Sequence, residues 1–79
     1  MTLKELAANP AKYIGKQLTV TGNGSDAGKY RIRAFYDYGS VVSIDLSDSP
    51  SFPLGGDTRV TLTENGFKIK GDPYSFVCE

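Results

Sequence analysis

From residue 16 onward, the chain is a series of short segments in which apolar and polar residues alternate. Turns rich in glycine, proline and asparagine separate the segments, and such alternation is typical of half-buried strands. Connections this short leave no room for helical crossovers between parallel strands. The sequence therefore predicts an all-β barrel of five to six antiparallel strands. The strand segments are 18–21, 29–36, 41–46, 59–63, 67–70 and 74–78.

A short helix precedes the first strand. Thr2 and Glu5 have the spacing of a capping box, and Leu3, Leu6 and Ala7 then share one helical face. Asn9-Pro10 ends this turn and begins another, with Asn9 as its cap, which stops at Gly15. We expect Tyr13 and Ile14 to pack inward and the helical segment to cover one end of the barrel. A helix that binds a partner is the alternative.

The expected connections differ in length and character. Gly22 to Gly28 is a flexible glycine-rich loop, and 37–40 is a hairpin turn. Ser47 to Asp57 contains two prolines and two adjacent glycines, which predicts a loop that Phe52 and Leu54 pin to the body. Asn65-Gly66 predicts a type I′ hairpin turn, in which glycine supplies a positive φ.

The composition limits the chemistry that the chain can perform. The 79 residues, expected to form a single domain over 1–79, include no histidine and one cysteine, Cys78, and their formal net charge is zero. Histidine is the commonest general base and metal ligand. We therefore predict no catalytic residue, no metal site and no cofactor. No apolar segment approaches membrane-spanning length, so we expect a soluble cytoplasmic protein that does not bind a membrane.

One strand carries most of the local positive charge. Period-two spacing places Lys29, Arg31, Arg33 and Phe35 on one face of the 29–36 strand, and Tyr36 and Tyr38 extend the aromatic surface at its turn. Cations that follow phosphates beside rings that stack on bases are typical of single-stranded nucleic-acid binding. Three interpretations stay open: an ordinary solvated face, a nucleic-acid face, and a surface for a protein or another ligand.

The stretch from Asn9 to Gly22 resembles the opening of many small bacterial OB-fold domains, which run from a helix through a Tyr-x-Gly-Lys sequence, here Tyr13 to Lys16, into an alternating strand and a glycine. The resemblance implies a small barrel that binds single-stranded nucleic acid or oligosaccharide across its second and third strands. The chain departs from that pattern in the Ser47–Asp57 loop, where such domains usually have a helix.

The sequence thus predicts a non-enzymatic binding module. Its ligand would be single-stranded nucleic acid, bound over the Lys29–Phe35 face. The alternative is a protein-interaction or structural component that uses aromatic residues exposed on its loops. The candidate anchors for that role are Tyr36, Tyr38, Phe52 and Tyr74. The oligomeric state stays open.

Overall fold

The protein is a curled antiparallel β-sheet with a short helix at one end. The computed structural model describes residues 1–48, 50–71 and 73–79. Two helical segments come first, α1 (Leu3–Ala8) and the 3-10 helix η1 (Pro10–Lys12). The strands are β1 (Gln17–Gly22), β2 (Gly28–Asp37), β3 (Val41–Leu46), β4 (Ser51–Gly55), β5 (Thr61–Leu62), β6 (Phe67–Ile69) and β7 (Tyr74–Cys78). The all-β prediction with a short N-terminal helix is confirmed, with seven strands in place of five to six.

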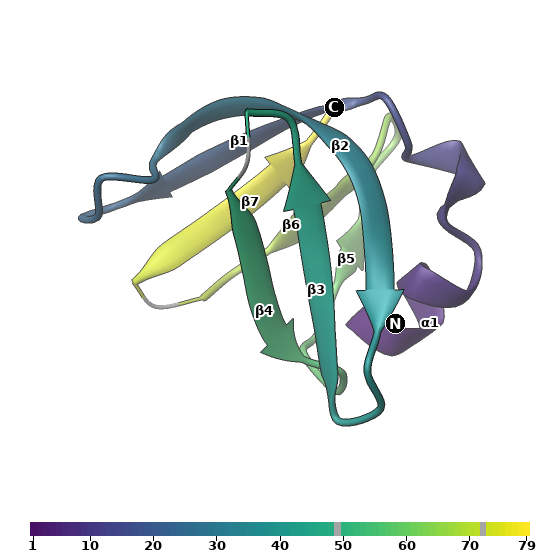
Figure 1. Cartoon of the computed structure of the whole chain (residues 1–79). Coiled ribbons are helices and arrows are strands. Elements are labelled where there is room, and N and C mark those ends of the chain that lie inside the picture. Colours follow the sequence, from purple (N-terminus) through teal and green to yellow (C-terminus); the bar gives the residue numbers. More distant parts are fainter. Residues whose placement is uncertain (49, 72) are drawn as a thin grey trace.

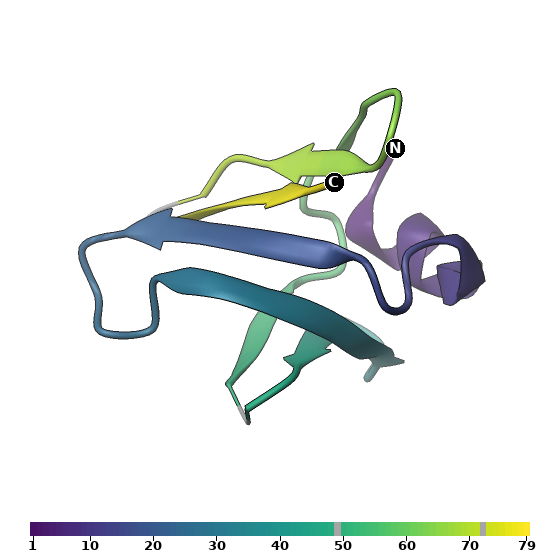
Figure 2. The same cartoon turned by 90° about the horizontal axis from the view of Figure 1, so that it is seen from above.

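The strand order in the sheet is β4-β3-β2-β1-β7-β6-β5, and all pairings are antiparallel. Neighbouring strands also follow one another in the sequence, except that β1 pairs with β7. The long strand β2 bends so that its first half pairs with β1 and its second half with β3. Figures 1 and 2 show the result, a half-barrel in which β2 arches from one limb of the sheet to the other.

The prediction of a loop over 47–57 is wrong, because this segment contains β4. Phe52 lies opposite Ile44 and Leu54 lies opposite Val42, so both side chains face the core. The hydrogen bonds Leu46 N–H to Pro50 O and Gly56 N–H to Ser40 O set the alternation of the ladder. By that alternation the nitrogen of Pro53 faces the free edge of β4. Proline is tolerated there because no partner needs its missing N–H.

The segment between β4 and β5 is held by the N-terminus instead of by a sheet. Of the strand predicted over 59–63, only Thr61–Leu62 is regular, and Arg59 forms an isolated bridge with Thr2. The Leu3 N–H donates to Thr58 O over 2.8 Å, and the Lys4 N–H donates to Gly56 O over 2.9 Å. These bonds place α1 across the end of the half-barrel where β3 begins, as the sequence predicted (Figure 1).

The predicted capping box is present at the start of α1. The Glu5 N–H donates to the Thr2 hydroxyl, and the Thr2 N–H donates to the Glu5 carboxylate over 2.9 Å. Of the apolar residues predicted to pack inward, Leu3, Leu6 and Tyr13 are buried.

The second helical turn differs from the prediction in three ways. It is a 3-10 helix over Pro10–Lys12, and Asn9 makes no side-chain cap to it. Ile14 is 42% exposed instead of packed inward. The turn does stop at Gly15, as predicted. Gly15 has a φ of +87°, a conformation that glycine adopts at little cost.

A single cluster of buried side chains fills the curl of the sheet. Phe67 lies near its centre, with ring centroids 5.2 Å from Tyr13 and 6.4 Å from Phe35. All strands except β5 contribute to the core. Its members are Leu3, Leu6, Tyr13, Leu18, Val20, Ile32, Val42, Ile44, Leu46, Phe52, Val60, Phe67, Ile69, Phe76 and Cys78.

The turn before β6 is where the sequence predicted it, but its geometry is different. Thr63 and Gly66 close the turn, since the Thr63 N–H donates to Gly66 O over 2.9 Å. Neither Asn65 nor Gly66 is among the described residues with positive φ, so the type I′ prediction is wrong. Glycine is needed at 66 for a different reason: a Cβ there would overlap the carbonyl oxygen of Cys78.

Candidate ligand-binding face

A β-bulge in β2 decides which of its side chains point outward. Ile32 pairs with Leu46 but Ala34 pairs with Asp45, so Arg33 is an extra residue in β2. An extra residue reverses the alternation of inward and outward positions beyond it. Before the bulge Tyr30 and Ile32 face the core, and after it Phe35 does, opposite the buried Ile44.

The prediction that Phe35 shares a face with the three cations is therefore wrong. Its side chain is partly buried and packs against the core beside Phe67. The next residue, Tyr36, pairs with Ser43 on the outer side and is 48% exposed. The bulge thus exchanges one aromatic residue for another on the side of the strand that carries the cations.

Five of the six predicted site residues lie on the outward side of β2 and its turn. We call this set the outer face: Lys29, Arg31, Arg33, Tyr36 and Tyr38. Lys29 pairs with Thr19 and Arg31 with Gln17 across β1, both on the outer side of the sheet. Arg33 is exposed at the bulge.

The three cations differ in how much of their hydrogen-bonding capacity is used. The Arg31 guanidinium donates through Nη1 to the Gly15 carbonyl oxygen over 2.9 Å, which ties β2 to the turn before β1. Its remaining donors point to no partner within the described residues. Lys29 and Arg33 make no hydrogen bond or ion pair in that part of the chain. All three positive charges are therefore available to an anion, and two of them have no partner among the residues that the structure describes.

The two tyrosines of the outer face stand next to each other at its far end. Their ring centroids are 6.4 Å apart and their planes are tilted by 36°. Tyr38 is 70% exposed, and Val41, which follows the turn, is 37% exposed. The β2–β3 hairpin thus offers an aromatic surface next to Arg33.

Two other residues predicted as protein-binding anchors are not exposed on loops. Phe52 is 7% exposed, and its ring centroid is 5.4 Å from that of Tyr74. Tyr74 is half-buried. Its hydroxyl oxygen lies against Gly24, in the loop that connects β1 to β2, so closely that a Cβ at Gly24 would overlap it. Tyr30 also holds this loop, donating its hydroxyl to Asp26 O over 2.7 Å.

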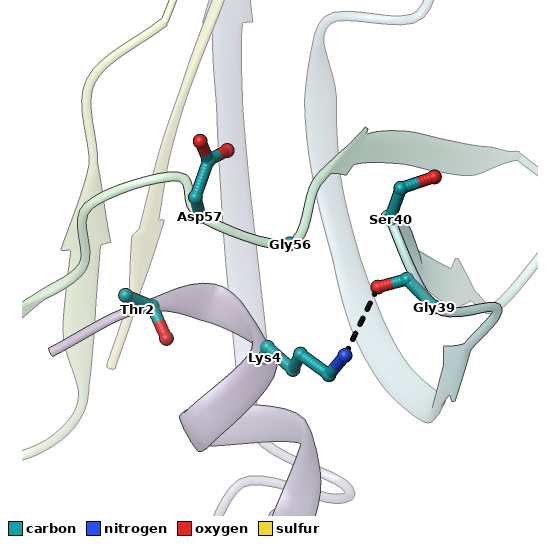
Figure 3. A pocket seen from close by; sticks show the side chains of 6 residues that line it. All are labelled: Thr2, Lys4, Gly39, Ser40, Gly56 and Asp57. Atoms are coloured by element: carbon teal, nitrogen blue, oxygen red, sulfur yellow. Dashed lines mark hydrogen bonds between the residues drawn. The ribbon is translucent and has the colours of Figure 1, made fainter.

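A polar hollow lies where α1 meets the β2–β3 turn (Figure 3). The Lys4 ammonium at its wall donates to the Gly39 carbonyl oxygen over 3.3 Å, while the Asp57 side chain points away from it. The Lys4 charge is thus already directed at a carbonyl group of the chain. The hollow lies at the end of the half-barrel that α1 covers, and none of its lining residues belongs to the outer face.

Among the titratable groups of the described residues, Glu5 and Cys78 have shifted pKa values, and neither lies on the outer face. Hydrogen bonds from the Thr2 backbone and side chain lower the pKa of Glu5. Burial raises the pKa of the Cys78 thiol. Within 1–48, 50–71 and 73–79, no cluster of three or more His, Cys, Asp or Glu side chains could hold a metal ion. None of the described helices has the length and apolar character needed to cross a bilayer.

The sequence pattern named the cations and both tyrosines of this face, but it also placed Phe35 there. Alternation alone assigns Phe35 to it, and only the pairing of β2 with β3 reveals the extra residue that brings Tyr36 there. Comparisons with protein-family models, curated proteins and solved structures find no match.

Proposed function

We propose that this protein is a non-enzymatic binding module that holds single-stranded nucleic acid along the outer face. The observation that carries the proposal is the bulge in β2, which brings Tyr36 to the side of Lys29, Arg31 and Arg33. Cations spaced along a strand follow the phosphates, and the adjacent rings stack on bases. The proposal includes a cytoplasmic location and requires no cofactor.

The dimensions of the face suit a short single strand. Measured along the chain, the backbone from Lys29 to Tyr38 is about 30 Å long, at roughly 3.3 Å per residue, and it follows the bend of β2. Sites of about 4–16 nucleotides are usual for small barrels that bind single strands. Because the formal net charge of the chain is zero, affinity depends on this local arrangement and is sensitive to salt.

A relationship to OB-fold domains is the finer part of the proposal. It is supported by the Asn9–Gly22 stretch, by the size and curl of the sheet, and by the position of the face on β2. OB-fold barrels have a Greek-key strand order, whereas the order here runs mainly through sequence neighbours. The nucleic-acid proposal therefore rests on the outer face and not on descent.

Fluorescence anisotropy with labelled ten-nucleotide oligo-dT and oligo-rU tests this function. If three cations each contact a phosphate, log K against log salt has a slope of about −2, from about −0.7 per contact. Tyr36→Ala should weaken binding by about 1–3 kcal/mol, the usual contribution of one stacked base. Absence of binding at low salt would overturn the proposal.

Charge variants with matched controls distinguish binding that depends on the position of the outer-face cations from binding that depends on net charge alone. Lys29→Gln with Arg33→Gln removes two cations that make no hydrogen bond within 1–48, 50–71 and 73–79, so we expect weaker binding and a salt slope that is smaller by about 1.4. Lys12→Gln with Lys68→Gln removes the same charge elsewhere. Equal losses from the two pairs would show that binding follows net charge, and the outer face would then have no special role.

A protein partner is the second candidate, favoured by the exposure of Tyr36, Tyr38 and Val41 on one hairpin. Aromatic residues are enriched among the residues that dominate interface energy. A pull-down with Tyr36→Ala plus Tyr38→Ala should then lose a partner that Lys29→Gln plus Arg33→Gln retains. A partner lost only with the charge variant would argue against this second function.

A further inference from the structure

The half-barrel is open between β4 and β5, because these two strands are the edges of the sheet and do not pair with each other. A groove of about 450 Å³ lies there, between β4 and the ends of β6 and β7. We call it the seam groove, defined by Phe52, Leu54, Thr58, Ile69, Lys70, Tyr74 and Phe76. It belongs to the core side of the sheet, whereas the outer face lies on the other side.

The floor of the seam groove is apolar and firmly packed. Ile69 is 2% exposed and Phe76 is 1% exposed, so both belong to the core. The Phe52 ring packs edge-on against Phe76, with centroids 5.2 Å apart, and edge-on against Tyr74 at 5.4 Å. Leu54 and Tyr74 are only partly buried and form the walls. Preformed apolar hollows of about 300–1,000 Å³ are typical of small-molecule sites.

Among the described residues, the rim of the groove carries one positive charge. Lys70 is exposed and is the one charged side chain among the described lining residues. It makes no hydrogen bond or ion pair within that part of the chain. Asp72, which follows Gly71 in the sequence, lies outside the described residues. Within the described lining, an apolar floor below one ammonium group is complementary to a molecule with an apolar body and one negative charge.

The free edge of β4 disfavours an added peptide strand as the occupant. Strand addition relies on a row of main-chain donors and acceptors. Pro53 lacks a donor at the centre of this edge, and the Gly55 carbonyl oxygen already accepts from the Thr58 N–H over 3.0 Å. A peptide would find an interrupted ladder, whereas a small ligand needs only the hollow and the charge.

We propose that the seam groove binds a small amphipathic anion, an aromatic or aliphatic body that carries one carboxylate or sulfonate. The body packs on Phe52 and Phe76 between Leu54 and Tyr74, and the anionic group faces the Lys70 ammonium. This site is independent of nucleic-acid binding, because none of its residues belongs to the outer face.

Two fluorescent probes that share the same ring system test the proposal on the full chain. The anion 8-anilinonaphthalene-1-sulfonate should bind saturably, and neutral N-phenyl-1-naphthylamine should bind more weakly. Amide shifts in NMR spectra should change for Phe52, Leu54 and Tyr74 while the rest of the spectrum stays that of the folded protein. Decanoate should displace the sulfonate probe, whereas decyltrimethylammonium should not.

Variants of the lining residues separate the contribution of the Lys70 charge to probe binding from that of the apolar hollow. Lys70→Gln should weaken binding of the sulfonate probe by about 1.4- to fivefold, the range expected for an exposed ion pair, and leave binding of the neutral probe unchanged. Lys68→Gln is the matched control, since Lys68 lies on the same hairpin but does not line the groove. Leu54→Trp should fill the hollow and abolish binding of both probes.

Three results would overturn the proposal, and none depends on the Leu54→Trp variant being folded. They are shift changes confined to other residues, equal effects of Lys70→Gln and Lys68→Gln, and equal affinity for the anionic and the neutral probe. If the outer-face variants lose nucleic-acid binding but still bind the probes, the seam-groove proposal is supported independently of the outer face. If the seam-groove variants lose probe binding but still bind nucleic acid, the nucleic-acid proposal is likewise unaffected.

Discussion

Replacing Gly66 by alanine tests the close approach between the β5–β6 turn and β7. The new Cβ would overlap the carbonyl oxygen of Cys78. That oxygen belongs to a strand fixed on both sides, because Cys78 pairs with Leu18 of β1 and with Phe67 of β6. The turn itself is also tethered, since Lys16 Nζ donates to the Asn65 carbonyl oxygen over 2.8 Å. Neither backbone segment can shift without loss of these bonds.

The size of the effect follows from two opposing contributions. Overpacking against fixed backbone costs about 2–3 kcal/mol, the upper part of the range for such changes. Removing a glycine from the unfolded chain stabilises by about 0.4–1 kcal/mol when φ is unstrained. We expect a net loss of about 1–2.5 kcal/mol in the free energy of unfolding. In a domain of this size, that loss lowers Tm by roughly 5–20 °C.

Thermal and urea unfolding followed by circular dichroism measure this loss, and two further variants separate it from an effect of φ. Gly66→Asn carries a Cβ but tolerates positive φ, so it should lose about as much as Gly66→Ala. Asn65→Ala should stay within about 0.5 kcal/mol of the parent, as exposed substitutions usually do. It retains the carbonyl oxygen that Lys16 uses.

The opposite pattern would refute this reasoning. A type I′ turn would tolerate Gly66→Asn, and Asn65→Ala would then cost about 1–2 kcal/mol, because alanine resists the left-handed conformation. If those two results were observed together, the turn would have positive φ at both positions and the contact with Cys78 would not be limiting.

Three other features lead to direct tests. Because hydrogen bonds lower the pKa of Glu5 below its ordinary value of 4.5, the capping box stabilises the folded state above that pH and loses this contribution as pH falls through the lowered pKa. Glu5→Gln should therefore reduce Tm at neutral pH and have little effect near about pH 2; an equal effect at both would contradict this. The Cys78 thiol should react slowly with iodoacetamide until urea unfolds the chain, because it is buried and its pKa is raised; equal rates with and without urea would place it at the surface. Phe35→Ala should cost about 1–3 kcal/mol, less than a fully buried phenylalanine, whereas Tyr36→Ala should be nearly neutral for stability; the reverse order would show that β2 has no bulge.

Features set by near neighbours could be predicted from the sequence. The capping box of Thr2 and Glu5 depends on residues three apart, and it is present. The alternation in 18–21 and 41–46 assigns the buried residues of β1 and β3 correctly, because neither strand contains an extra residue relative to its neighbours. Local spacing and local hydrogen bonds decide these elements, so distant parts of the chain do not change them.

Features set by distant partners could not be predicted. The 51–55 segment has the composition of a loop, and it becomes a strand because β3 pairs with it on one side and nothing pairs with the Pro53 side. The bulge at Arg33 depends on how β2 meets β3, and no residue in β2 signals it by type. Alternation along the sequence therefore places the three cations on the side of β2 where the structure has them, and it places Phe35 on the wrong side.

The pairing of β1 with β7 has a consequence for how the chain folds. Strands β1 to β4 form one arm and β5 to β7 another, and within each arm the contacts join sequence neighbours that meet quickly. The pairing that joins the arms brings Leu18 beside Cys78, so the chain from Leu18 to Cys78 forms one closed loop. Non-local pairing of this kind slows folding. We therefore expect docking of the two arms to limit the folding rate. During synthesis, the β1 edge of the first arm stays unpaired until β7 has been made.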